Sequence, residues 1–174
     1  MEAALYRLRQ GLRALFAFAF AVDESLAAHH LSPALLASFR AMRRSERQHS
    51  LRVLRALLRA GEVSPALAIA ALLHDVGKSC YPMALWQRSL PVLVRAIAPT
   101  LFARLSQSDP QNPWVRGFVV YMHHPRWSAE IIIRCGGGDD AAWLAEHHAD
   151  DAQQWRTHPL SADLVRLKYA DDHE

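Results

Sequence analysis

Apolar positions recur three and four residues apart along most of the chain, separated by short polar breaks, which is the pattern of amphipathic helices. Serine–proline pairs begin two of these segments, at Ser32–Pro33 and Ser64–Pro65, where serine can cap a helix and proline fits its first turn. Gly61 and the glycine run 136–138 follow such segments and are typical of helix ends. Convincing strand pairs and hairpin turns are absent from the pattern. The chain is therefore predicted to be all-α.

The predicted helices differ most in how completely apolar they are. Residues 66–73 carry no polar side chain, so the helix that contains them should be central and fully buried.

Pro99 should interrupt one helix and Pro125 should begin another, because proline lacks the N–H that a helix interior requires. We expect helices over residues 2–22, 33–42, 45–60, 65–77, 90–106, 113–123, 125–136, 139–150 and 161–171.

The first segment has some features of a signal peptide. An apolar run over residues 14–22 follows three arginines, but Glu2 precedes them and Asp23–Glu24 come directly after the run. The run is also far shorter than the ~18 apolar residues that a membrane-crossing helix needs. We interpret this segment as a buried helix, with a helix on a membrane surface as the alternative. No transmembrane segment is predicted, and a cytoplasmic location is expected.

The composition is that of a single domain with its own core. The chain has 174 residues, of which 51% are hydrophobic and 21% are charged, so disorder is not expected. Cys80 and Cys135 are its two cysteines, which excludes a disulfide-rich secreted scaffold. Seventeen of the 20 lysines and arginines lie upstream of residue 135. This asymmetry indicates either a basic face for an anionic ligand or a set of solvated helix faces.

Histidine is the unusual component, with 10 residues of this type. His74 and Asp75 follow directly after the most apolar segment of the chain, where burying them unpaired would cost several kcal/mol. Metal coordination would satisfy both side chains. His49 shares a helix face with Val53 and Ala56, so it should point inward as well.

Other predicted helices carry metal-ligand residue types near their ends. His124 stands directly before Pro125, His147 and His148 lie near the end of a short helix, and Asp171 lies near the end of the last. Any one of these residues alone would more often be part of an ordinary core or surface. Together they form an ordered set of imidazoles and carboxylates, which suit first-row divalent ions such as Fe²⁺, Mn²⁺ and Zn²⁺.

This ordered set resembles the HD superfamily of metal-dependent phosphohydrolases. Residues 71–78, ALLHDVGK, are similar to its central signature, and residues 49–53, HSLRV, to its first motif. Residues 124–131, HPRWSAEI, resemble the third motif of the HD-GYP branch, in which a glycine usually takes the place of the serine. The doublet His147–His148 and the segment Tyr169–Asp171 resemble that branch's histidine doublet and closing aspartate.

The resemblance covers about residues 33–172 and implies an HD-domain helical bundle. We expect this domain over residues 31–174, with an extension of about two helices over residues 1–30. The chain departs from the HD-GYP pattern after the histidine doublet, where it lacks the Gly-Tyr-Pro loop that is tied to cyclic di-GMP hydrolysis. Ser45 stands where three-metal members carry a glutamate. A two-metal site is therefore the better expectation.

The resemblance also implies which residues bind the two divalent metal ions, taken as Fe, Mn or Zn. The first ion would be held by residues of the first, second and closing motifs: His49, His74, Asp75 and Asp171. The second ion would share Asp75 with the first and would be held by the remaining imidazoles: His124, His147 and His148. A carboxylate can bridge in this way because it has two oxygens.

The implied chemistry is phosphoryl hydrolysis. Two metal ions about 3.5–4 Å apart can acidify a shared water and hold a phosphoryl group for in-line attack. Asp75 and Lys78 would be the catalytic residues, and Lys78 would neutralise a phosphate oxygen. Arg126 is a candidate for a second contact with the substrate phosphate.

Three functions remain open from the sequence. The favoured one is an enzyme that hydrolyses a phosphate mono- or diester, with a nucleotide or signalling nucleotide as its substrate. The second is a non-catalytic, metal-binding HD module with a signalling or regulatory role. The third is a di-iron oxygenase on the same fold. A phosphate-ester small molecule is the expected partner, DNA binding is not predicted, and the oligomeric state is open.

Overall fold

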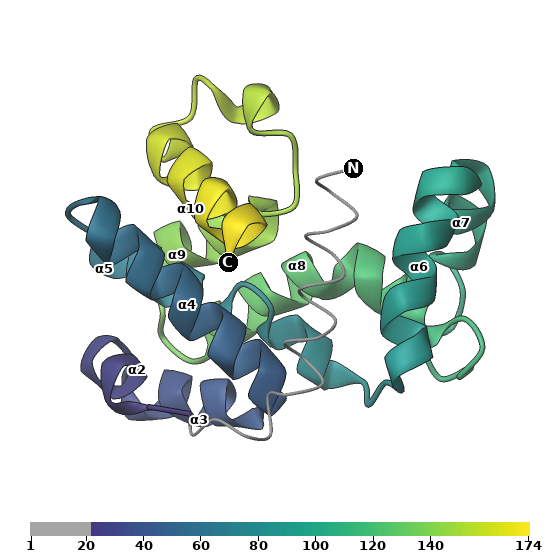
Figure 1. Cartoon of the computed structure of the whole chain (residues 1–174), viewed down its shortest axis with the longest axis horizontal. Helices are drawn as coiled ribbons and strands as arrows, with labels where there is room; N and C mark the ends of the chain where they lie inside the picture. The colour runs from purple at the N-terminus through teal and green to yellow at the C-terminus, as the bar shows by residue number, and fades with distance from the viewer. Residues whose placement is uncertain (1–21) are drawn as a thin grey trace.

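The computed structural model describes residues 22–174, and every regular element in this part of the chain is a helix (Figure 1). The prediction of an all-α fold is confirmed, whereas the helix predicted over residues 2–22 lies outside the described residues. The α-helices are α2 (Ser25–His30), α3 (Pro33–Ala41), α4 (Arg44–Ala60), α5 (Pro65–Leu73), α6 (Leu85–Ile97), α7 (Pro99–Leu105), α8 (Arg116–Arg134), α9 (Asp139–His147) and α10 (Ser161–His173). Two short 3-10 helices, η2 (Val76–Cys80) and η3 (Ala152–Trp155), lie between them.

The serine–proline pairs begin helices as predicted. The Ser32 hydroxyl accepts a hydrogen bond from the Leu35 N–H at the start of α3, and the Ser64 hydroxyl accepts one from the Leu67 N–H at the start of α5. Each cap satisfies one of the backbone donors that a helix start leaves without a partner. Helices α3 and α5 therefore begin at the predicted residues, 33 and 65. The bounds of α3 and α4 agree with the predicted ones to within a residue.

Helix α5 is the buried centre of the bundle, as its sequence predicts. All of its residues from Leu67 to Leu73 except Ile69 are fully buried, and the helix contacts α4, α9 and α10. It ends at Leu73 rather than at Gly77, because the chain turns at His74 and Asp75 and continues as the 3-10 helix η2. This turn leaves two polar side chains at the end of the most apolar helix.

Helix α8 corrects one prediction. Pro125 does not begin a new helix but lies within a single helix from Arg116 to Arg134. Proline cannot donate to the Tyr121 carbonyl four residues earlier. The Nδ1–H of His124 donates to that oxygen instead, at 3.0 Å, so the carbonyl keeps a partner and the helix continues.

Helix α6 begins five residues earlier than predicted, at Leu85. The Ala84 N–H donates to the Gln87 side-chain oxygen at 2.6 Å, which caps the start of the helix, and Pro91 lies inside it. The predicted break near Pro99 is confirmed, since Ala98 leaves the helical conformation between α6 and α7.

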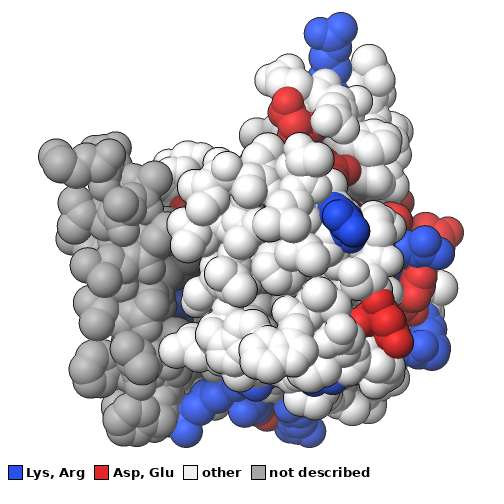
Figure 2. All heavy atoms as spheres, turned by 90° about the vertical axis from the view of Figure 1, so that its right-hand side faces the viewer, with Lys and Arg blue, Asp and Glu red and all other residues white. Residues whose placement is uncertain are grey.

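The side of the molecule formed by α6 and α7 carries few charged groups (Figure 2). These two helices carry six exposed apolar side chains: Leu85, Trp86, Leu90, Leu93, Ile97 and Leu101. None of the helices over residues 22–174 combines the length and the apolar character that a membrane crossing requires.

The close approach of η2 to α8 positions the end of α5. The Gly77 N–H donates to the Ser128 hydroxyl at 2.9 Å. A Cβ atom at Gly77 would overlap the carbonyl oxygen of His124 and would lie 2.9 Å from the backbone nitrogen of Ser128. The absence of a side chain at Gly77 therefore allows η2 to lie against the turn of α8 that carries His124.

We predict that Gly77→Ala lowers the free energy of unfolding by about 2–3 kcal/mol, because the added methyl group must push η2 away from α8. Chemical denaturation followed by tryptophan fluorescence measures this loss. Gly136→Ala is the control, since Gly136 has a positive φ of 78° but open space around it. That substitution should cost about 1 kcal/mol. An equal or smaller loss for Gly77→Ala would contradict the close approach.

Candidate metal centre

Six of the seven predicted metal ligands converge at one buried place in the bundle. They are imidazoles and carboxylates from α4, the turn after α5, α8, the turn after α9, and α10: His49, His74, Asp75, His124, His148 and Asp171. We call these residues the six-residue cluster. They form three overlapping triads, and within each triad the potential ligand atoms all lie within 4.8 Å of one another.

Backbone carbonyls fix the orientation of three of the imidazoles. The Nδ1 atoms of His74, His124 and His148 lie 3.1, 3.0 and 2.7 Å from carbonyl oxygens one helical turn earlier. A carbonyl only accepts hydrogen bonds, so each Nδ1 must carry the proton. When these rings are neutral, their Nε2 lone pairs therefore remain for a ligand. This is the arrangement by which proteins orient histidines on metals.

His49 and Asp171 close the other side of the cluster. The Nε2 atom of His49 lies 2.6 Å from the Asp171 Oδ1 atom, and the Nε2 atom of His74 lies 3.4 Å from the same oxygen. The His74 Nε2 atom is buried and has no hydrogen-bond partner. A buried polar atom without a partner costs about 1–3 kcal/mol, and a metal ion at this place would relieve that cost. The donor set and its geometry therefore fit a divalent metal.

The two oxygens of Asp75 face different parts of the cluster. Its Oδ1 atom lies 3.3 Å from the Nε2 atom of His124 and 3.9 Å from that of His148. Its Oδ2 atom lies 2.7 Å from the Lys78 ammonium and 3.7 Å from the Nε2 atom of His74. One carboxylate thus lies between two groups of imidazoles, which is the position that a bridging ligand requires.

The electrostatics of the cluster favour cation binding. Burial opposes the charged form of Asp75, but Lys78 and then His74 outweigh it and hold its pKa well below the ordinary value. Burial also opposes the charged form of Asp171, but His74 and His49 likewise lower its pKa. Burial, followed by the neighbouring His74 and His124, lowers the pKa of His148 to about 3. Two ionised carboxylates and a neutral imidazole are the forms that bind metals.

In the absence of a metal ion, a protonated His74 supplies the positive charge that faces Asp75 and Asp171. Burial disfavours its charged form, but Asp75 and Asp171 outweigh burial and raise its pKa to about 9. Metal binding would release this proton, because a ligating imidazole must offer its lone pair.

Lys78 reaches the cluster as predicted, whereas two other predicted residues lie differently. The Nδ1 atom of His147 lies 2.7 Å from the Asp150 carboxylate, and its ring packs 4.1 Å from that of Trp155. Arg126 has a side chain that is 72% exposed and pairs with Glu130 on the same helix. The structure does not bring His147 into the triads, and its role as a ligand stays a prediction, as does the phosphate contact of Arg126.

Of the two residues that support the site, one left a signal in the sequence and the other left none. Asp150, which binds both His147 and the Trp155 indole N–H, follows the histidine doublet but belongs to no motif. Ser128 did leave a signal, because it stands where the resembled motif usually has glycine, and its hydroxyl accepts the Gly77 N–H.

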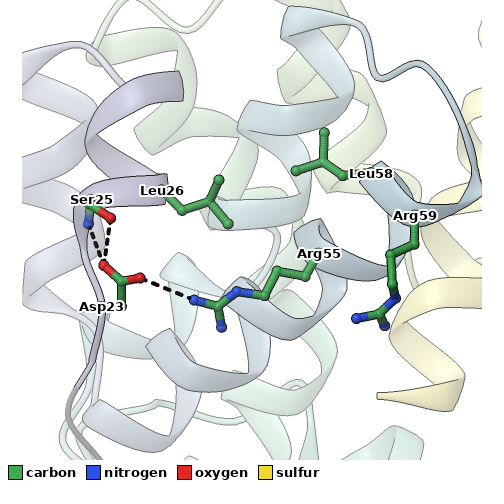
Figure 3. A pocket seen from close by; sticks show the side chains of 6 residues that line it. All are labelled: Asp23, Ser25, Leu26, Arg55, Leu58 and Arg59. Carbon is green, nitrogen blue, oxygen red and sulfur yellow. Dashed lines mark hydrogen bonds and ion pairs between the residues drawn. The ribbon is translucent and has the colours of Figure 1, made fainter.

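An open groove elsewhere on the surface is separate from this cluster. It lies between α2 and α4 and is lined by polar and apolar side chains (Figure 3): Asp23, Ser25, Leu26, Arg55, Leu58 and Arg59. Asp23 accepts a hydrogen bond from the Ser25 hydroxyl and lies 3.6 Å from the Arg55 guanidinium. None of the cluster residues lines this groove.

An all-α bundle that places histidines and aspartates from five segments around one point is the architecture of a metal-binding helical domain. The family model of the HD domain matches residues 47–174, and the chain belongs to this family. No curated protein and no solved structure gave a match. The HD domain is typical of a superfamily of metal-dependent hydrolases. The match includes every predicted site residue and begins within α4, so the predicted domain boundary at residue 31 stays a prediction, as does the HD-GYP branch.

We predict that Asp75→Asn weakens the binding of Mn²⁺ to the purified protein by about 100-fold or more, because the amide removes the shared negative charge from the centre of the cluster. Equilibrium dialysis with metal analysis measures the affinity. Asp163→Asn is the matched control, since Asp163 lies near the start of α10 and pairs with Arg166 outside the cluster. Equal Mn²⁺ affinities of the two variants would contradict the position of Asp75 at the centre of a metal site.

Proposed function

We propose that this protein is a metal-dependent phosphohydrolase that cleaves a phosphate mono- or diester, with a nucleotide as its favoured substrate. The observation that carries the proposal is the position of Asp75. Its carboxylate lies between imidazoles on one side and the Lys78 ammonium on the other, 2.7 Å away. An ammonium beside the proposed metal ligands is a group that can neutralise a phosphate oxygen.

The proposed site holds about two divalent ions that share Asp75. The first ion would be bound by two imidazoles and two carboxylates: His49, His74, Asp75 and Asp171. The second would be bound by the residues of the remaining triad: Asp75, His124 and His148. His147 directly precedes His148 in the chain, and its Nδ1 atom is held by Asp150. It would therefore join the second ion through Nε2, once that atom approached the remaining triad.

When bound, the ions would neutralise phosphate charge and make a water molecule more acidic. The residues of the chain supply the rest. Asp75 would hold Lys78 in place, and the ammonium would contact a non-bridging phosphate oxygen as negative charge builds up on it. The Lys78 side chain is 28% exposed, so it lies where a phosphate could reach it from solvent. Burial opposes its charged form, but Asp75 outweighs burial and raises its pKa, which keeps the ammonium charged.

The reaction consumes one water for each ester bond. Oxygen from water forms the new bond to phosphorus, the bond to the ester oxygen breaks, and the leaving oxygen takes up a proton. A monoester would give inorganic phosphate and an alcohol, whereas a diester would give a monoester and an alcohol.

We predict that Lys78→Gln lowers the rate of hydrolysis of p-nitrophenyl phosphate or bis(p-nitrophenyl) phosphate by about 100- to 1000-fold, because it removes charge stabilisation from the reacting phosphate. Metal content should stay at the wild-type level, and elemental analysis checks it. Arg134→Gln is the control, since it removes a positive charge from the exposed end of α8. Unchanged hydrolysis in Lys78→Gln would contradict the assigned role.

A broader panel of phosphate esters tests the proposal itself. Metal-loaded wild-type protein should cleave at least one mono- or diester of the panel, and Asp75→Asn should abolish that cleavage. If the wild type binds metal and is stabilised by it against thermal unfolding, yet cleaves no ester, the protein is a non-catalytic metal-binding module.

A further inference from the structure

Two arginines contact Glu46, whose charge acts on Lys78, and they have no role in the site described so far. Arg43 directly precedes α4, and Arg88 lies on α6. Both contact Glu46, which is 7% exposed: the Arg88 guanidinium pairs with its carboxylate, and the Arg43 backbone N–H donates to it at 3.0 Å. We call Arg43 and Arg88 the arginine pair.

Glu46 links this pair to Lys78, because its charge acts on the Lys78 ammonium. Glu46 lies one helical turn before His49 on α4, on the same face of the helix as that cluster residue. Residues 81–84 join η2, which carries Lys78, directly to α6, which carries Arg88. The Arg43 guanidinium also donates to the carbonyl of Met83 in this connection. The start of α4 therefore contacts both α6 and the connection that precedes it, and the charge of Glu46 at this contact acts on Lys78.

Glu46 and the arginine pair together carry more positive than negative charge. Glu46 supplies one buried negative charge to two guanidinium groups, and it also acts on Lys78, whose pKa is raised mainly by Asp75 against burial. Burial and then the positive charge of Arg88 lower the pKa of Arg43, so the two like charges lie close enough to repel one another. The Arg88 Nε atom is buried and has no hydrogen-bond partner. An anion beside the pair would relieve both the repulsion and the missing hydrogen bond.

We propose that the arginine pair binds a second phosphoryl group of the substrate whose first phosphate lies at the metal centre. The substrate class is then a molecule with linked phosphates, such as a nucleoside di- or triphosphate. Guanidinium groups fit this role because their planar N–H donors match phosphate oxygens in pairs. The inference rests on the proposed function, since Lys78 and the metal ions must hold the first phosphate.

A purely structural role makes a different prediction. If Arg88 serves only to neutralise Glu46, its replacement would lower stability and leave the preference between anions unchanged. Arg88→Lys separates these roles, because lysine keeps the positive charge beside Glu46 and loses the planar set of donors. Arg43→Gln provides a second route, since Glu46 contacts the backbone N–H of Arg43 and not its guanidinium.

The test measures the binding of inorganic phosphate and of tripolyphosphate to the Mn²⁺-loaded full chain by isothermal titration calorimetry. The wild type should bind tripolyphosphate more tightly than phosphate. Arg43→Gln and Arg88→Lys should each weaken tripolyphosphate binding by about tenfold or more, since each loses charge-assisted hydrogen bonds, with little change for phosphate. Arg95→Gln is the control, because Arg95 lies on the same helix and donates to the Tyr121 hydroxyl instead.

Several results would overturn the inference. The wild type could bind both anions equally or bind neither, or the two variants could weaken both anions to the same extent. The test does not depend on turnover, because it measures binding. If the wild type binds tripolyphosphate selectively through the arginine pair but hydrolyses no phosphate ester, the proposed hydrolysis fails while the anion site stands.

Discussion

The buried carboxylate of Asp75 is the interaction on which the site depends. Burying this charge is costly, and the Lys78 ammonium at 2.7 Å together with the imidazoles around it makes the burial possible. The same requirement explains the surrounding architecture. The chain must turn sharply after α5, and Gly77 must lie against α8, for the carboxylate to be brought next to His124.

The histidines are positioned by main-chain atoms more than by other side chains. His74, His124 and His148 each donate from Nδ1 to a carbonyl one turn earlier, so the helices themselves determine which nitrogen faces the cluster. In α8 this hydrogen bond has a second consequence, because it gives a partner to the carbonyl that Pro125 cannot satisfy. The hydrogen bond that orients this candidate ligand therefore also gives the helix a partner for the carbonyl before Pro125.

The sequence predicts the all-α fold, the central position of α5 and six of the candidate ligands that the structure brings together, because these follow from apolar spacing, helix caps and an ordered series of motifs. It does not predict the continuity of α8 through Pro125, which depends on a side-chain hydrogen bond from His124. It also places His147 with the ligands; the structure pairs the Nδ1 atom of this residue with Asp150 and leaves it outside the triads, so its role stays a prediction. The contact of Glu46 with Arg88 joins α4 to α6 through residues that are 42 positions apart in the sequence. No local pattern in the sequence shows which helices will meet.

We propose that the cluster holds metal ions on both sides of Asp75, and a count of the bound ions decides whether it does. The count is made by elemental mass spectrometry after dialysis against Mn²⁺, for the wild type, His124→Ala and His123→Ala. His123 is the matched control, because its Nε2 atom lies 3.1 Å from the Ser106 carbonyl, outside the cluster. We expect about two ions per chain in the wild type and in His123→Ala, and about one in His124→Ala. A single ion in the wild type, or a count that His124→Ala leaves unchanged, would contradict the proposal.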